Sequence, residues 1–142
     1  MNLSKKLGWV LLLCLTVWAC RKDDSNITGI PLVNVNIQLF TNDPAFINLQ
    51  VPGGFDYITG GSRGIVVYRL SNDQFMAYDR HCPYQVEDAC QVAVDSSGVI
   101  LEDACCGSRY IITDGSVVRG PSAAQLQMYQ TEFNGSVLRI FN

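Results

Sequence analysis

The chain is divided by turn residues into short runs whose side chains alternate between apolar and polar. Residues 33–39 (VNVNIQL) show the two-residue period of a half-buried strand. Residues 126–133 and 137–141 flank the dipeptide Asn134-Gly135, which favours a type I′ hairpin turn because both residues tolerate positive φ. Beyond residue 19, no run keeps a helical period over the length of an ordinary helix. The sequence therefore predicts an all-β fold, a small antiparallel sandwich or barrel.

Further runs of apolar and aromatic residues are bounded by Gly, Pro, Asn, Asp or Ser, which favour turns. Some of these runs enclose short polar loops and are predicted to form hairpins: residues 65–70 with 74–78, and residues 110–112 with 117–118. Others are predicted to be single strands: residues 46–51 and 99–101.

The first 19 residues have the pattern of a secretion signal. Lys5 and Lys6 precede an apolar run, residues 7–17, which is too short to span a bilayer but suits a signal-peptide core. The run leads to Ala19-Cys20, and a small residue directly before a cysteine resembles the cleavage box of bacterial lipoproteins. The alternative is an ordinary signal peptide with a chance cysteine. We expect a lipoprotein signal peptide (1–19), a polar tether acylated at Cys20, for instance with palmitate (20–31), and a β domain (32–142).

The residues after Cys20 bear on location and partners. Residues 21–24 (RKDD) resemble the Lys-Asp-Asp export tag of some Bacteroidetes surface lipoproteins, and a plain polar tether is the alternative. We expect a lipid-anchored protein of the bacterial outer membrane, facing the cell surface or the periplasm. The net charge is −3, and removal of the signal peptide takes away Lys5 and Lys6 but no acid. Nothing in such an acidic chain would neutralise phosphates, so we do not expect a nucleic-acid partner.

Two loops contain most of the cysteines of the predicted domain. Residues 80–84 read RHCPY and residues 103–110 read DACCGSRY, and Asp-Gly and Arg-Gly-Pro follow at 114–115 and 119–121. These strings resemble the cluster-binding loops of Rieske iron–sulfur domains, which read Cys-Thr-His and Cys-Pro-Cys-His-Gly-Ser-Arg-Phe. The resemblance covers about residues 60–142. It implies a Rieske-like antiparallel β fold whose two loops meet at one tip.

The resemblance also assigns the positions of the cluster ligands. A Rieske cluster is held by two cysteine thiolates on one iron and two imidazoles on the other. Cys82 matches the first cysteine, but Tyr84 replaces the first histidine, Asp103 the second cysteine and Cys106 the second histidine. The only histidine, His81, is expected to face away as an exposed loop residue. We therefore expect no [2Fe–2S] cluster and no metal, the alternative being an altered cluster completed by a partner's ligand.

The same resemblance implies a disulfide between the loops. It matches Cys105 to one half of that bond and makes Cys90 its natural partner, although the first loop is longer here than in the family. Cys82 and Cys106 would then face each other and are expected to form a second disulfide. The alternatives are the swapped pairing, a strained bond between Cys105 and Cys106, and a zinc site made of all four cysteines.

The functional expectation follows from the lost ligand pattern. A single histidine leaves no Ser–His–Asp triad, and we do not expect an enzyme. We expect a disulfide-stabilised structural or interaction module of the cell envelope, with an envelope protein as its possible partner. One alternative is an electron-transfer protein with an altered [2Fe–2S] site. The other is a small envelope enzyme or thiol–disulfide protein that uses the cysteines for redox chemistry.

Overall fold

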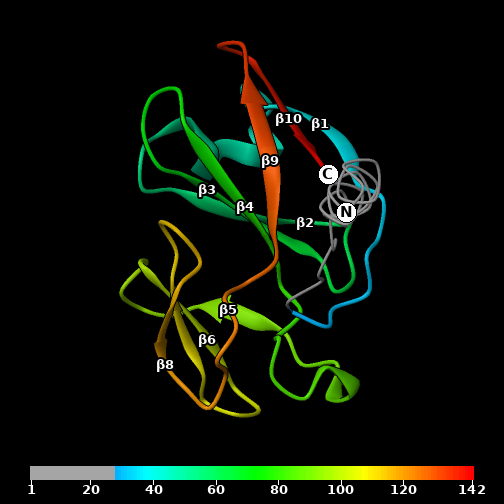
Figure 1. The fold of residues 1–142 in the computed structure, drawn as a ribbon. Helices are drawn as coiled ribbons and strands as arrows, with labels where there is room; N and C mark the ends of the chain where they lie inside the picture. Colours follow the sequence, from blue (N-terminus) through cyan, green and yellow to red (C-terminus); the bar gives the residue numbers. More distant parts are fainter. Residues whose placement is uncertain (1–27) are drawn as a thin grey trace, which may run out of the picture.

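The computed structural model describes residues 28–142, so the predicted signal peptide, Cys20 and most of the tether lie outside the described residues. Within residues 28–142 no helix is long and apolar enough to cross a membrane. Thr28 and Ile30, in the segment expected to be tether, are buried. The described residues form two antiparallel sheets, drawn in Figure 1. Their strands are β1 (Asn36–Phe40), β2 (Phe55–Ile58), β3 (Ile65–Arg69), β4 (Phe75–Asp79), β5 (Val92–Val94), β6 (Ile100–Asp103), β7 (Arg109–Ile111), β8 (Val117–Arg119), β9 (Met128–Phe133) and β10 (Val137–Phe141).

The larger sheet has the strand order β1-β10-β9-β4-β3-β2, and the smaller sheet has the order β5-β6-β7-β8. The hairpin β3–β4 forms a wall shared by the two hydrophobic cores. Because successive side chains of a strand point to opposite faces, Ile65 and Val67 enter one core, while Val66 and Tyr68 enter the other. This explains why β3 reads as a continuous apolar run with no alternation.

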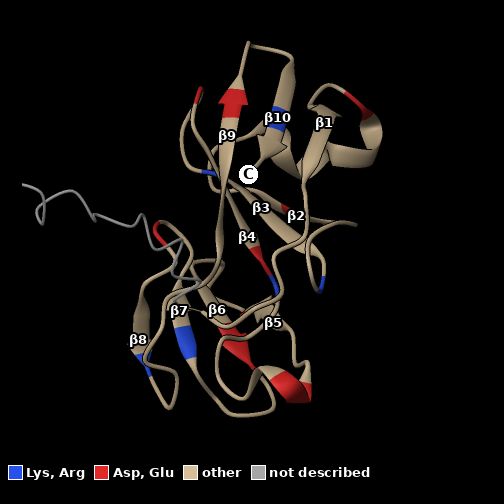
Figure 2. Cartoon of the chain, turned by 45° about the vertical axis from the view of Figure 1, so that its right-hand side comes forward, with Lys and Arg blue, Asp and Glu red and all other residues tan. Residues whose placement is uncertain are grey.

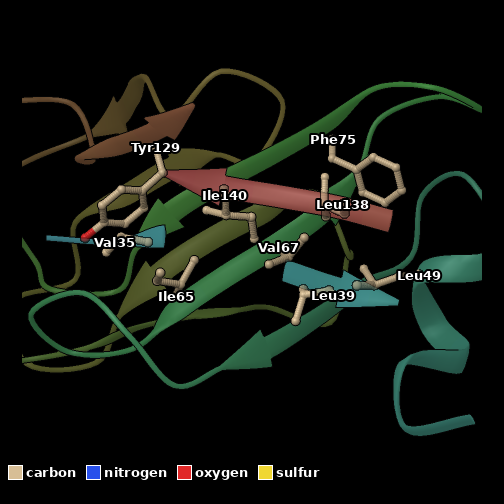
Figure 3. Packing of buried hydrophobic residues seen from close by; sticks show 10 residues of the cluster. Val35, Leu39, Leu49, Ile65, Val67, Phe75, Tyr129, Leu138 and Ile140 are labelled. Atoms are coloured by element: carbon tan, nitrogen blue, oxygen red, sulfur yellow. The ribbon is translucent and has the colours of Figure 1, made fainter. Parts of the chain in front are cut away.

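Side chains from the strands of the larger sheet pack together to form the first core, as Figure 3 shows. It is closed by the 3-10 helix η2 (Pro44–Gln50), whose Leu49 is fully buried. The prediction of a strand over residues 46–51 is therefore wrong. Asp43 accepts a hydrogen bond from the Ala45 amide (2.8 Å), and Pro44 occupies the first turn, so both residues start a helix at this point.

The second core lies between the smaller sheet and the β3–β4 hairpin, and its largest side chains are those of Tyr78 and Tyr110.

The three predicted hairpins are confirmed as β3–β4, β7–β8 and β9–β10. The strands β2 and β5 were not predicted. The prediction of a type I′ turn at Asn134-Gly135 is wrong. Such a turn requires positive φ at both residues, and only Gly135 has it. The Asn134 side chain instead accepts the amides of Ser136 (3.1 Å) and Val137 (2.8 Å), which closes the turn.

Candidate functional site

The candidate site lies where two loops meet at the end of the smaller sheet, away from the β9–β10 turn in Figure 1. The first loop, residues 80–91, joins β4 to β5 and contains the short 3-10 helix η3 (Val86–Asp88). The second loop, residues 104–108, joins β6 to β7. A disulfide between Cys90 and Cys105 connects them, and the Cys82 amide donates to the Cys90 carbonyl (3.0 Å). This is the predicted two-loop tip.

The second loop is a tight turn that returns over the end of β6. The Gly107 amide donates to the carbonyl of Asp103 (2.7 Å), and the Asp103 amide donates to the carbonyl of Ser108 (2.9 Å). Gly107 takes φ of +74°, a conformation that glycine adopts without strain. The turn thereby brings the side chain of Cys106 back over that of Asp103.

Three of the four sequence-predicted ligand positions come together at the tip. The Cys82 and Cys106 sulfurs are 3.9 Å apart, and Cys106 Sγ lies 3.2 Å from Asp103 Oδ2. The two sulfurs and a carboxylate oxygen all lie within 4.8 Å of one another. Cys82 and Asp103 are each only 1 % exposed, whereas Cys106 is half-buried. The site therefore has a buried floor and one side that solvent reaches.

Each sulfur is surrounded by hydrogen-bonding groups. The Tyr110 hydroxyl lies 3.4 Å from Cys82 Sγ, which also receives a hydrogen bond from the backbone of Tyr84. Cys106 Sγ lies 3.1 Å from Ser108 Oγ and accepts the Ser108 amide (3.4 Å). Burial, together with the hydrogen bond to Asp103, raises the pKa of the Cys82 thiol to about 12. In the absence of a cation, the Cys82 thiol is therefore protonated at neutral pH.

Asp103 is positioned by hydrogen bonds from the second loop to its carboxylate. Its Oδ1 accepts the Cys105 amide (2.8 Å), and Oδ2 accepts the Cys106 thiol. The arginines of the neighbouring strands in Figure 2 pair elsewhere: Arg109 with Asp95 and Glu102, and Arg119 with Glu102. Among residues 28–142, no Lys or Arg forms an ion pair with Asp103.

Tyr84 contributes its backbone to the site. The ring packs partly buried against the second core, and the backbone hydrogen bond to Cys82 is its contact with the thiols. Among the hydrogen bonds within residues 28–142, none joins the Tyr84 phenol to Cys82, Asp103 or Cys106. Of the four positions assigned by the resemblance, Cys82, Asp103 and Cys106 thus supply donor atoms, and Tyr84 positions one of them.

His81 is buried, so the prediction that it is an exposed loop residue is wrong. Its Nε2 lies 2.8 Å from the Val86 carbonyl, so this nitrogen carries the proton, and its Nδ1 accepts the Ser62 hydroxyl at 2.8 Å. Its backbone amide donates to Asp79 (2.8 Å). Both ring nitrogens are therefore engaged with groups other than the thiols, and His81 is not a ligand of the tip.

Sequence reasoning missed the buried Asp79 that holds this part of the tip. Asp79 Oδ2 accepts the Tyr129 hydroxyl (2.7 Å) and the Ser62 amide (2.6 Å). Gly61 lies directly against it, since a Cβ there would come within 2.4 Å of Asp79 Oδ2. The available signal was a carboxylate that ends an otherwise apolar strand, β4.

The cysteine pairing matches the expectation at one of two bonds. The Cys90–Cys105 disulfide is present, whereas the expected Cys82–Cys106 bond is not formed and both thiols are free. The reason is local, because Cys106 is held towards Asp103 and Ser108, and Cys82 towards Tyr110. The swapped and adjacent pairings are likewise not formed. The four-cysteine zinc site is also unavailable to the chain, because the disulfide consumes two of the thiols.

The donor set does not fit a Rieske [2Fe–2S] cluster. Such a cluster requires two imidazoles on one iron, but the only histidine of the chain has both ring nitrogens occupied. The position of the second thiolate holds Asp103, a hard oxygen donor that is poorly suited to an iron–sulfur cluster. The tip offers two sulfurs and one carboxylate, and these are the groups from which its chemistry must be derived.

Comparison with known proteins bears on the fold. No protein-family model and no curated protein sequence matches the chain. The structure is similar to the cyanobacterial plasma membrane Rieske protein PetC3 from Synechocystis PCC 6803, with TM-score 0.55 and 20% identity over 78% of this chain and 100% of that chain. It is also similar to the ferredoxin of carbazole 1,9a-dioxygenase from Nocardioides aromaticivorans IC177, with TM-score 0.51 and 13% identity over 78% and 98%. The described residues therefore have a Rieske-type fold.

Proposed function

We propose that this Rieske-type fold serves without a [2Fe–2S] cluster, as a disulfide-stabilised structural or interaction module of the bacterial envelope, anchored in the outer membrane through acylated Cys20. The observation that carries the proposal is the donor set at the tip. Two thiols and a carboxylate stand where a cluster needs two thiolates and two imidazoles, and His81 is held by Ser62 and Val86. Electron transfer through an altered cluster is the competing function.

Connections supplied by the protein itself support the proposal, because they join the loops of the tip independently of any cluster. The Cys90–Cys105 bond closes a loop with a sequence separation of 15 residues, worth about 3 kcal/mol in the chain-entropy model. Ser108 adds a second connection, since its hydroxyl oxygen accepts the Ser122 amide (2.9 Å) beyond β8. Both connections support a role in which the two loops present a fixed surface at the end of the domain.

The decisive experiment is iron and sulfide analysis of the full-length chain, made in iron-replete cells and purified in detergent. We expect a colourless protein with no rhombic electron-spin signal after reduction. The comparison protein is the variant that restores the family pattern, Tyr84→His with Asp103→Cys and Cys106→His, prepared in parallel. About two irons and two acid-labile sulfides per wild-type chain would overturn the proposal and establish the electron-transfer function.

Thiol–disulfide exchange is a second candidate, because the free sulfurs of Cys82 and Cys106 are only 3.9 Å apart. A thiolate is the species that attacks a disulfide. Burial keeps the Cys82 thiol protonated, with a pKa of about 12, so the half-buried Cys106 would have to be the attacking group. Turnover of a disulfide substrate that is abolished by Cys106→Ser would favour this function over a structural one.

A further inference from the structure

We propose that Cys82, Cys106 and Asp103 form a site for one borderline divalent transition-metal ion, of which Zn²⁺ is the natural probe. The ion would have three protein ligands and a fourth position open to solvent. The inference goes against the absence of metal expected from the sequence. It rests on the proposed function, because a [2Fe–2S] cluster would require the same cysteines.

The spacing of the donor atoms suits one ion. Two sulfurs bound at about 2.3 Å to a single tetrahedral zinc lie about 3.8 Å apart, and a sulfur and a carboxylate oxygen lie about 3.5 Å apart. The corresponding distances here are 3.9 Å between the two sulfurs and 3.2 Å between Cys106 Sγ and Asp103 Oδ2. In a [2Fe–2S] cluster, two ligands that bind different irons lie farther apart than two ligands of one ion, because the distance between the irons adds to their separation. The tip is therefore spaced for a mononuclear site.

The donor types suit the same kind of ion. Thiolates are soft ligands that select zinc and similar transition metals over magnesium or calcium, and zinc also accepts a carboxylate oxygen. The ion would displace the thiol protons of Cys82 and Cys106 to solvent, two protons for two metal–sulfur bonds. It would also give Asp103 the cation it lacks, since no Lys or Arg pairs with it among residues 28–142.

The groups around the donors are arranged to hold thiolates. Cys82 receives the backbone hydrogen bond from Tyr84 and lies against the Tyr110 hydroxyl. Ser108 Oγ accepts the Ser122 amide, so its own proton is free to point at Cys106 Sγ, 3.1 Å away. Such outer hydrogen bonds fix the orientation of metal ligands. They are built into the backbone and the core here, so the three ligands need little rearrangement on binding.

The fourth position follows from the burial of the ligands. Cys82 and Asp103 are each 1 % exposed and form the floor, and Cys106 is half-buried. An ion would therefore be approached from the side of Cys106. A zinc ion with three protein ligands and one exchangeable position is the arrangement of sites that bind a water or an outside ligand, whereas structural zinc sites have four protein ligands.

The test is metal analysis of the full-length chain, expressed with added zinc and purified in detergent without reductant. We expect one zinc per chain. With Co²⁺ in its place, we expect the sulfur-to-cobalt charge-transfer band and the visible bands of a tetrahedral site. Cys82→Ser and Cys106→Ser should each abolish stoichiometric binding, and Asp103→Asn should weaken it on the order of tenfold or more. Asp43→Asn, which alters the cap of η2 and should keep it capped, is the matched carboxylate control and should bind as wild type.

The outcomes separate this inference from the proposed function. Detection of the Cys90–Cys105 disulfide by mass spectrometry shows that a variant has folded. A wild-type chain without zinc, whether its Cys82 and Cys106 are free or joined in a disulfide, overturns the metal site but leaves the cluster-free module intact. Iron with acid-labile sulfide overturns both. Binding that survives Cys106→Ser or that equals wild type in Asp103→Asn assigns the ion to other residues and overturns the inference.

Discussion

At the scale of single residues, two buried tyrosines of the second core differ in what their hydroxyl groups contact. The Tyr110 hydroxyl lies 3.4 Å from Cys82 Sγ, whereas the Tyr78 hydroxyl has no hydrogen-bond partner within residues 28–142. An unpaired buried hydroxyl costs about 1 to 3 kcal/mol of stability. Burial and the nearby Asp114 carboxylate raise the pKa of Tyr78, so the group is neutral over the physiological range.

We predict that Tyr78→Phe stabilises the domain. The substitution removes the unpaired hydroxyl and keeps the ring, so the free energy of unfolding should rise by about 1 kcal/mol and the Tm by about 4 °C. Tyr110→Phe is the matched control, because the same change there removes the contact with Cys82 and should lower the stability. Thermal unfolding followed by circular dichroism measures both. A lower Tm in Tyr78→Phe would show that its hydroxyl has a partner.

At the scale of secondary-structure elements, the sequence predicted features that depend on neighbouring residues. The hairpins β3–β4, β7–β8 and β9–β10 follow from apolar runs around short polar turns. The apolar residues of η2 resemble a strand when they are considered alone, whereas the Asp43-Pro44 pair before them favours the helix that forms. The strands β2 and β5 were missed because they are short and their pairing partners, β3 and β6, determine them.

The disulfide between the two loops is the element-scale feature with the largest predicted effect on stability. Replacing both partners, Cys90→Ser with Cys105→Ser, should lower the free energy of unfolding by about 3 kcal/mol, because a loop of 15 residues is released in the unfolded chain. Chemical denaturation measures this loss. Reductant provides the control: it should lower the Tm of wild type and leave that of the double variant unchanged. A reductant-sensitive double variant would assign the effect to another bond.

At the scale of the whole molecule, the tip shows what the sequence could not supply. The resemblance located Cys82, Tyr84, Asp103 and Cys106, and it gave the Cys90–Cys105 bond. It could not give the 3.9 Å between the Cys82 and Cys106 sulfurs or the engagement of His81, because both depend on contacts between distant segments. Cys82 follows β4 in the wall between the cores, and Cys106 follows β6 in the smaller sheet. Their distance is set by how the two sheets pack.

The membrane anchor is the remaining prediction at this scale, and it falls on residues outside the described part of the chain. If Cys20 is acylated, acyl chains contributing about 0.8 kcal/mol per buried methylene hold the protein in the membrane. Cys20→Ala should abolish incorporation of labelled palmitate and either release the protein from membranes or leave the precursor uncleaved. Cys14→Ala is the matched control, because this cysteine lies in the predicted signal peptide and should have no role in anchoring. Normal processing, labelling and membrane retention of Cys20→Ala would contradict acylation at Cys20 and assign the lipid and the membrane attachment to another residue.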